Sequence, residues 1–424
     1  MVEIELMSNV RIPPEAAKRG SYQGWREAID AALDIKECPH WTLGAASGFV
    51  GPVLGLCDFD TCGLNLSGPS SRGKTTAVAL GVSCWTSPLI TSGGLLRSMR
   101  TTENSIELAA RQANHTILGL DELGHVDGKL VGRAIYFLSG GISKARMSPK
   151  LILQPQYTWR TFVLLSSEQS LAQKVVGDGG HWTGGMAVRF VDVDCTEVDA
   201  KVPKDILAKI AGIYRNYGVA NFVFGTAFLD HELDTEANAA QLRAKVLDAA
   251  DAIAGEQADG ARRRAALPFA LIGVCGTLAR QFGVLPKTAD IDAAVAWGWE
   301  KFTRSVEAQA LNPEGLAMAN LRRWIAQHWG VAIKKTDEPY KSSRDALGWY
   351  DRDAIYIPVG RVSEAIDGAL SIAAFARLLG RAELLWDRTD DRRAAIRRVP
   401  DVGKVDVYAL KRAAFRDDKG SSDD

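Results

Sequence analysis

The stretch Gly68-Pro-Ser-Ser-Arg-Gly-Lys-Thr75 follows a short apolar run and precedes residues 76–85, which have the pattern of a helix. A strand, a glycine-containing loop, Lys-Thr and a helix form the context in which the pattern G-x-x-x-x-G-K-[S/T] binds phosphate. Glycines let backbone N–H groups turn inward without a Cβ in the way, and a helix N-terminus attracts anions. The alternative is a chance match in a glycine-rich chain, and the flanking strand and helix patterns argue against it.

This stretch therefore predicts a site for ATP and Mg²⁺. Lys74 is expected to neutralise phosphate charge, and the Thr75 hydroxyl is expected to hold Mg²⁺. The predicted nucleotide-binding residues are Gly68, Pro69, Ser70, Ser71, Arg72, Gly73, Lys74, Thr75 and Thr76.

A second motif lies about fifty residues further along the chain. The apolar run 116–120 predicts a strand, and it ends in Asp121-Glu122. Asp121 would hold the Mg²⁺ shell through water, and Glu122 would polarise the attacking water as a general base. A strand followed by an ordinary polar turn is the alternative, because Leu-Asp-Glu is common by itself. The spacing from Lys74, with a helix between, favours an ATPase.

The region after the second motif contains a predicted hairpin with cations near its tip. Glycines, then Lys144, Arg146 and Lys150, then alternating apolar and polar residues indicate this hairpin. From charge alone, a solvated hairpin is as good an interpretation as a nucleic-acid contact. The next apolar run, 161–165, predicts a strand that ends in Ser166 and Ser167, where a hydroxyl could reach the γ-phosphate.

A fourth predicted strand spans residues 184–194, with Arg189 near its start. Apolar strands separated by helices are typical of a doubly wound α/β core with its ligand at the carboxyl ends of parallel strands. The expected fold class is therefore α/β with a P-loop core.

The composition limits the classes of partner. The chain has 424 residues, 46% hydrophobic and 24% charged, with a formal net charge of zero. A generally basic nucleic-acid coat is excluded, so any DNA contact must come from a local patch. Scattered cysteines without C-x-x-C favour reduced thiols in the cytoplasm. The N-terminus does not have a signal-peptide pattern, and no run of eighteen apolar residues predicts a membrane span.

Several stretches together resemble a family known as "domain of unknown function 927". They include Ser67-Gly-Pro-Ser-Ser-Arg-Gly-Lys-Thr-Thr76, Leu120-Asp-Glu-Leu-Gly124, Leu138-Ser-Gly-Gly-Ile-Ser-Lys-Ala-Arg146 and Leu165-Ser-Ser-Glu168. The resemblance extends over residues 20 to about 280. Members of this family are bacterial and phage P-loop ATPases, often beside primase modules in mobile elements, and are similar to AAA+ helicases of the minichromosome-maintenance type.

The resemblance implies further roles. Ser166 or Ser167 would occupy the sensor-one place, and Arg189 would be an arginine finger that reaches a neighbouring subunit's ATP. An ordinary surface arginine is the alternative for Arg189. Lys144 and Arg146 would lie on a hairpin that touches DNA. Pro268 stands where many relatives have an arginine, so the second sensor is in doubt, and a residue of Arg262-Arg-Arg264 could replace it.

The rest of the chain predicts helices and then a mixed region. Residues 371–380 predict a helix, and residues 392–410 predict a two-stranded wing that contains Arg392, Arg397 and Arg398. A winged helix that contacts DNA and one that contacts protein both remain open. The expected organisation is an N-terminal helical region (1–58), an ATPase core (59–200), a helical lid (201–311), a winged-helix-like domain (312–416) and a disordered tail (417–424).

Together these features predict an ATP-hydrolysing DNA motor, specifically a ring-forming, hexameric replicative helicase of a plasmid, phage or cassette. Its expected partners are single-stranded or forked DNA and a primase or another replication protein. A remodelling ATPase that acts on proteins is the alternative, as is a DNA-binding switch without unwinding activity.

Overall fold

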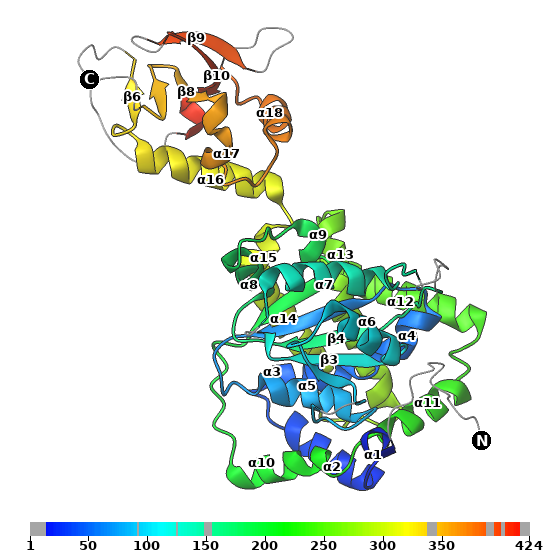
Figure 1. The fold of residues 1–424 in the computed structure, drawn as a ribbon. Helices are drawn as coiled ribbons and strands as arrows, with labels where there is room; N and C mark the ends of the chain where they lie inside the picture. Colours follow the sequence, from blue (N-terminus) through cyan, green and yellow to red (C-terminus); the bar gives the residue numbers. More distant parts are fainter. Residues whose placement is uncertain are drawn as a thin grey trace. The chain divides into compact units, whose positions relative to one another are not determined.

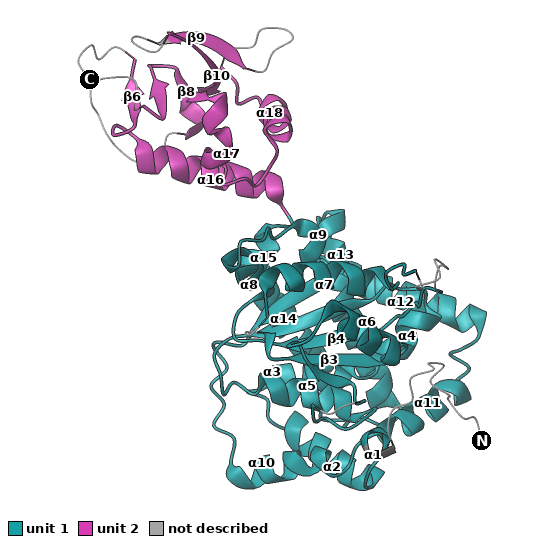
Figure 2. Cartoon of the chain, viewed as in Figure 1, with its two compact units in different colours: residues 1–311 teal, residues 312–424 magenta. Residues whose placement is uncertain are grey.

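The structure is a computed structural model that describes residues 14–90, 93–123, 126–147, 155–336, 346–386, 394–399 and 403–415. The chain divides into two compact units, Met1–Leu311 and Asn312–Asp424, which are coloured separately in Figure 2.

A five-stranded sheet lies at the centre of the first unit (Figure 1). Its strands are β1 (Cys62–Ser67), β2 (Leu96–Ser98), β3 (Ile117–Asp121), β4 (Phe162–Ser166) and β5 (Phe190–Asp194). The order is β2-β3-β4-β1-β5, and every pair of neighbours is parallel. The strands are buried along almost their whole length, as expected when helices cover both faces of a parallel sheet. The predicted α/β class with a parallel sheet is confirmed.

Helices surround this sheet. They are α1 (Pro14–Ala17), α2 (Tyr22–Leu33), α3 (Pro39–Ser47), α4 (Val50–Leu56), α5 (Lys74–Ser83), α6 (Glu103–Gln112), α7 (Gly128–Gly140), α8 (Leu171–Gly177), α9 (Gly184–Ala187), α10 (Lys204–Ile210), the 3-10 turn η2 (Ala211–Tyr214), α11 (Ala220–Asp230), α12 (Glu236–Ala254), α13 (Gly260–Gln281), α14 (Ile291–Thr303) and α15 (Val306–Gln309).

The structure corrects the predicted fourth strand. Residues 184–187 form the helical turn α9, and the Thr183 side chain caps it by accepting from the Met186 N–H. The strand β5 begins only at Phe190. The glycine pair at 184–185 and the Thr183 cap therefore decide the local structure over the apolar pattern that follows them.

The helix α3 packs tightly against α5, and Figure 1 shows the two side by side. A Cβ built on Gly44 of α3 would lie 2.2 Å from the Ala77 carbonyl oxygen of α5, and one on Gly81 would lie 2.4 Å from the Gly44 oxygen. These two glycines therefore let the helix backbones approach more closely than any side chain would allow. The N-terminal helices support the helix that follows the phosphate-type loop.

The second unit contains its own mixed sheet of five strands, in the order β6-β7-β8-β10-β9. Its elements are α16 (Pro313–His328), β6 (Ile333–Lys335), β7 (Gly348–Tyr350), β8 (Ala354–Pro358), η4 (Val359–Arg361), α17 (Val362–Ala365), α18 (Ile372–Arg381), β9 (Ala395–Val399), β10 (Gly403–Lys411) and η5 (Arg412–Phe415).

The residues predicted to form a wing lie in β9 and β10, which pair antiparallel. This hairpin is part of the larger sheet, since β10 also pairs with β8. The Arg397 guanidinium lies 5.1 Å from the centre of the Tyr356 ring, and Arg398 is exposed. Arg392 lies outside the described residues.

Among the described residues, no helix is long and apolar enough to cross a membrane. All six cysteines have free, buried thiols. Their side chains therefore belong to the packed interior.

The imidazole of His40, on α3, is fully buried, and neither ring nitrogen has a hydrogen-bond partner among the described residues. Its ring centre lies 5.8 Å from that of Trp41 and 6.2 Å from that of Trp297 on α14. Burial lowers the pKa of His40 to about 4, although the nearby carbonyls of Arg72 and Gly73 partly oppose this effect.

We expect Gly44→Ala to destabilise the first unit by about 1–3 kcal/mol, because the added methyl group meets backbone that cannot move aside. The matched control is Gly140→Ala at the end of α7, where a Cβ would meet nothing within 4 Å. Thermal unfolding followed by circular dichroism measures both variants. Equal melting temperatures for the two variants would show that the helix contact is not tight.

We also expect acid to destabilise the first unit partly through His40. The unfolded chain binds a proton at His40 below about pH 6.5, whereas the folded state resists protonation until about pH 4. Stability is therefore lost as pH falls through this window. His40→Phe should flatten the fall in melting temperature between pH 7 and pH 4.5, whereas the exposed-site control His231→Phe should not. Parallel curves for wild type and His40→Phe contradict this account.

Candidate functional site

The loop between β1 and α5 adopts a conformation that exposes its backbone. Gly68, Ser71 and Gly73 have φ values of 129°, 63° and 74°, in the region that L side chains rarely adopt. Gly73 is the residue that caps α5, and it does so without a side-chain hydrogen bond. The backbone N–H groups of residues 70–75 donate no hydrogen bond within the described part of the chain. Such a run of free donors at a helix N-terminus is suited to bind an anion.

Lys74 lies against this loop. Its side chain is buried, and its ammonium donates to the carbonyl oxygens of Gly68 at 2.7 Å and Pro69 at 2.6 Å. Burial lowers the pKa of Lys74, while Cys195, Glu168 and Asp121 partly oppose this effect. An ammonium hydrogen-bonded to neutral carbonyls would gain electrostatic stabilisation from phosphate oxygens. The residues present therefore fit a polyphosphate.

Two side chains from other elements hold the loop in place. The Trp41 indole of α3 donates to the Gly73 oxygen at 3.0 Å. Arg72 donates to the Val198 oxygen at 2.8 Å and forms an ion pair with Asp199 at 2.9 Å. The loop is therefore tied on one side to the N-terminal helices and on the other to the segment after β5.

The predicted acidic pair lies at the carboxyl end of β3. Asp121 ends the strand, and its Oδ1 accepts from the Glu122 N–H at 2.8 Å. Glu122 has a φ of 64°, which is uncommon for a residue with a side chain. The Ser98 hydroxyl, at the end of β2, donates to Glu122 Oε2 at 2.6 Å. Non-glycine residues held in this conformation are often found at functional sites, where surrounding contacts stabilise them.

The two serines at the end of β4 bond to different neighbours. The Ser166 hydroxyl donates to Asp121 Oδ1 at 2.5 Å. The Ser167 hydroxyl accepts from the Asn65 side-chain amide of β1 at 2.8 Å. Ser166 is therefore the serine that contacts the acidic pair, while Ser167 connects β4 to β1.

The side chains at this edge fit a hydrated Mg²⁺ ion. No group of three or more His, Cys, Asp or Glu side chains with metal-binding geometry occurs in the described ranges. Mg²⁺ usually keeps several waters and takes one or two protein oxygens together with substrate phosphates. The exposed Thr75 hydroxyl, in the first turn of α5, and the half-buried Asp121 carboxylate, at the end of β3, can supply those oxygens.

Arg189 lies at the amino ends of the strands, whereas the loop and the acidic pair lie at their carboxyl ends. It immediately precedes β5, and its carbonyl accepts from the Gly63 N–H near the start of β1. Its guanidinium is exposed, donates to the Gly185 oxygen at 2.6 Å and lies 5.5 Å from the centre of the Tyr136 ring. Five-residue strands separate these two ends by about 15 Å. Arg189 is therefore not brought together with the loop of its own chain.

The predicted hairpin begins as expected. Residues 141–143 pair with 157–159 through the Ile142–Thr158 bridge and the flanking backbone bonds. Lys144 and Arg146 are exposed after this pairing, and both form ion pairs with α6: Lys144 with Glu103, and Arg146 with the buried Glu107. Lys150 lies outside the described residues.

The arginines considered for the second sensor are exposed on the first turns of α13. Arg262 donates to the Ala254 oxygen at 2.9 Å, and Arg264 donates to the Gly260 oxygen at 3.1 Å. Arg263 lies 3.5 Å from Asp251. None of these bonds reaches the loop.

Sequence reasoning missed three residues that shape this site. Ser98 lies on a three-residue strand without a clear apolar pattern, and its partner Glu122 is 24 residues away. Trp41 and Asn65 lie in apolar runs that indicate only burial. The polar atom of each is a signal, since a buried indole or amide needs a hydrogen-bond partner.

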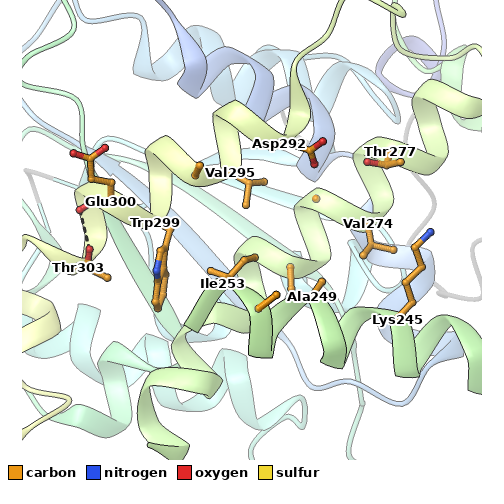
Figure 3. Close-up of a pocket in the computed structure, with 14 residues that line it drawn as sticks. Lys245, Ala249, Ile253, Val274, Thr277, Asp292, Val295, Trp299, Glu300 and Thr303 are labelled. Atoms are coloured by element: carbon orange, nitrogen blue, oxygen red, sulfur yellow. Dashed lines mark hydrogen bonds between the residues drawn. The ribbon is translucent and has the colours of Figure 1, made fainter. Parts of the chain in front are cut away.

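A separate groove lies between α12, α13 and α14 (Figure 3), with a volume of about 700 Å³. Figure 3 shows Lys245 and Thr277 toward one end and Trp299 and Glu300 toward the other. Its lining is mainly apolar and includes none of the predicted site residues.

Comparisons with known proteins concern the family and the fold of the chain. Residues 3–150 match the model of a family described as domain of unknown function (DUF927). The predicted resemblance is therefore confirmed over this stretch, which is shorter than the expected range of 20 to about 280. No curated protein matches the chain.

A solved structure described as "SCCmec type IV Cch - active helicase" is similar to this chain. The sequence identity is 17% and the TM-score is 0.67, and the alignment covers 94% of this chain and 72% of that chain. An identity this low shows the fold alone. The chain thus combines a DUF927 match over residues 3–150 with the fold of a solved helicase.

Proposed function

We propose that this protein is an ATP-hydrolysing DNA motor with an AAA+-type P-loop core. One observation carries the proposal. The carboxyl ends of the parallel strands bring together the loop with its free N–H groups, Lys74, the pair Asp121-Glu122, and Ser166. Ligands of open parallel sheets bind at these ends. The helicase fold match supports the same class of protein.

The roles of the residues follow from their chemistry. The N–H groups of the loop and Lys74 bind the β- and γ-phosphates, and Thr75 with Asp121 holds hydrated Mg²⁺, which neutralises phosphate charge. Glu122 orients and deprotonates the attacking water after its carboxylate leaves Ser98. Ser166, bonded to Asp121, senses the γ-phosphate.

The position of Arg189 supports a site shared between subunits. Its exposed guanidinium, at the amino ends of the strands, cannot reach the loop of its own chain but is available to a neighbouring subunit. A head-to-tail interface forms a ring when its rotation closes, and we propose that it closes here as a hexamer. The AAA+-type assembly is therefore part of the proposal, together with the division into core, lid and winged-helix-like domain.

Lys144 and Arg146 are the proposed DNA contacts. Both are exposed cations on one hairpin, so DNA phosphates could replace Glu103 and Glu107 as their partners. A local patch of this kind is compatible with a net charge of zero. Single-stranded or forked DNA, a primase partner, replication of a mobile element and a cytoplasmic location complete the proposal.

The same ion pairs favour a second candidate function. Since α6 already neutralises both cations in this structure, the hairpin could serve a remodelling ATPase or a nucleotide switch that does not unwind DNA. Strand displacement on a forked duplex, with Lys74→Ala as the inactive reference and mass measured by light scattering, separates the candidates. A monomer that does not unwind the duplex supports the second.

We expect Glu122→Gln and Arg189→Ala each to bind ATP but to lose turnover by about 10³-fold or more. Mixing the two variants should restore turnover, because a subunit with intact Glu122 can receive Arg189 from its neighbour. Random mixing in a head-to-tail ring gives about a quarter of such complete sites. Steady-state phosphate release measures the recovery.

The control for this mixture combines Glu122→Gln with Lys74→Ala. Both changes then damage the residues of a subunit's own site, so no complete site forms and the mixture should remain inactive. Wild-type turnover in Arg189→Ala, or a mixture with Arg189→Ala that stays silent, argues against a shared site.

We expect the double variant Lys144→Ala with Arg146→Ala to keep basal ATPase activity and to lose its stimulation by single-stranded DNA. The matched control is Arg133→Ala, which removes a cation that also pairs with Glu103 but lies on α7. Retained stimulation in the double variant, or lost stimulation in the control, excludes a specific role for the hairpin.

A further inference from the structure

Asp192, in the middle of β5, is a buried carboxylate that the proposed reaction does not use. Its side chain is 2% exposed, and it lies directly opposite Asn65 in the register of β1 and β5. Burial and the nearby Glu307 on α15, which is also buried, raise the pKa of Asp192 well above its usual range. Burying a carboxylate costs free energy, so its bonding partners indicate what it does.

Three donors from three chain segments converge on this carboxylate. Asp192 Oδ1 accepts from the Ser67 hydroxyl at 2.5 Å, and Oδ2 accepts from the Asn65 amide and the Leu171 backbone N–H, both at 2.8 Å. Ser67 is the residue before the phosphate-type loop. Asn65 also bonds to Ser167, the neighbour of the proposed sensor Ser166. Two of the three bonds therefore connect Asp192 to the back of the nucleotide site.

The third bond connects it to the segment that carries Arg189. Leu171 is the first residue of α8, so this bond fixes the point where the segment 171–189 begins. The segment ends at Arg189, three residues before Asp192 in the same chain. The carboxylate thus holds both ends of the segment, one by a hydrogen bond and the other through its own strand. The α8 helix contacts α15, which carries Glu307. The helix that begins at Leu171 and the helix that carries Glu307 therefore pack against each other.

We propose that Asp192 is a positioning residue that holds the Arg189 segment in a fixed relation to the nucleotide loop of its own subunit, so that the subunit can present its arginine to a neighbour. This inference rests on the proposed shared site. A carboxyl group suits the position because the three groups that form hydrogen bonds with it are all donors, and its two oxygens accept from all three. An amide keeps only one acceptor oxygen and carries an NH2 group in place of the other, so at least one of the three donors would lose its acceptor.

The experiment uses full-length subunits in the mixing assay. The subunit that receives the arginine, called the acceptor subunit, is Arg189→Ala, which has an intact Glu122 but no arginine to supply. The subunit that supplies the arginine, called the donor subunit, is Glu122→Gln, which contributes only its Arg189. This donor is tested with and without Asp192→Asn. We expect Asp192→Asn in the donor to reduce the kcat of the mixture at least tenfold, with an unchanged KM for ATP. When Asp192→Asn is placed in the acceptor instead, we expect the donated arginine to work and kcat to fall less than threefold.

The difference in kcat between the two arrangements distinguishes positioning from general stabilisation, because a purely structural loss would lower kcat equally in both. Equal losses, or no loss in the donor, overturn the inference and leave the shared site intact. A parent mixture without recovery overturns the shared site and this inference together. If Asp192→Asn does not fold, Ser67→Ala in the donor removes one of the three bonds. It should give a smaller loss of kcat, about threefold, and no loss in this variant also overturns the inference.

Discussion

The register of the parallel sheet is the constraint on which the site depends. Leu66 of β1 lies opposite Ser166 of β4, and Leu120 of β3 lies opposite Leu165. Because β4 stands between β1 and β3, this register places the start of the loop, the Ser166 hydroxyl and the Asp121 carboxylate in one row. A shift of one residue in any of these strands would turn the side chains to the other face of the sheet and break the row.

The sequence predicts this edge well but not its internal bonds. Polar residues at the ends of several apolar strands are expected to lie close to one another, because parallel strands bring their carboxyl ends together. The spatial order of strands does not follow from chain order, so the placement of β4 between β1 and β3 was not predictable. The Ser98–Glu122 bond and the ion pairs of Lys144 and Arg146 with α6 depend on that order. The helical turn α9 was missed because the apolar run beside it is the more conspicuous pattern in the sequence, although the Thr183 cap decides the local structure.

If the hairpin contacts DNA as proposed, its ion pairs predict that a protein with zero net charge would bind this polyanion only weakly at rest. Glu103 pairs with both Arg133 and Lys144, and the buried Glu107 pairs with Arg146. A phosphate that displaces Glu107 would leave a buried carboxylate without its cation, which costs free energy. The proposed DNA binding at this hairpin would therefore require several phosphates at once or a movement of α6. The exchange of ion-pair partners, and not the net charge of the protein, would then control the affinity for DNA.

Asp121 has more contacts in the candidate site than its proposed role toward Mg²⁺ requires. One oxygen of its carboxylate accepts from both the Ser166 hydroxyl and the Glu122 N–H. The second bond helps to hold Glu122 at a positive φ, and Ser98 holds the far end of the same side chain. The proposed general base is thus restrained at its backbone and at its carboxylate, on two neighbouring strands. A change at Asp121 would remove the bonds to both Ser166, the proposed sensor, and Glu122, the proposed base. An effect of that change on turnover is therefore assigned to Mg²⁺ binding only together with a separate measurement of metal affinity.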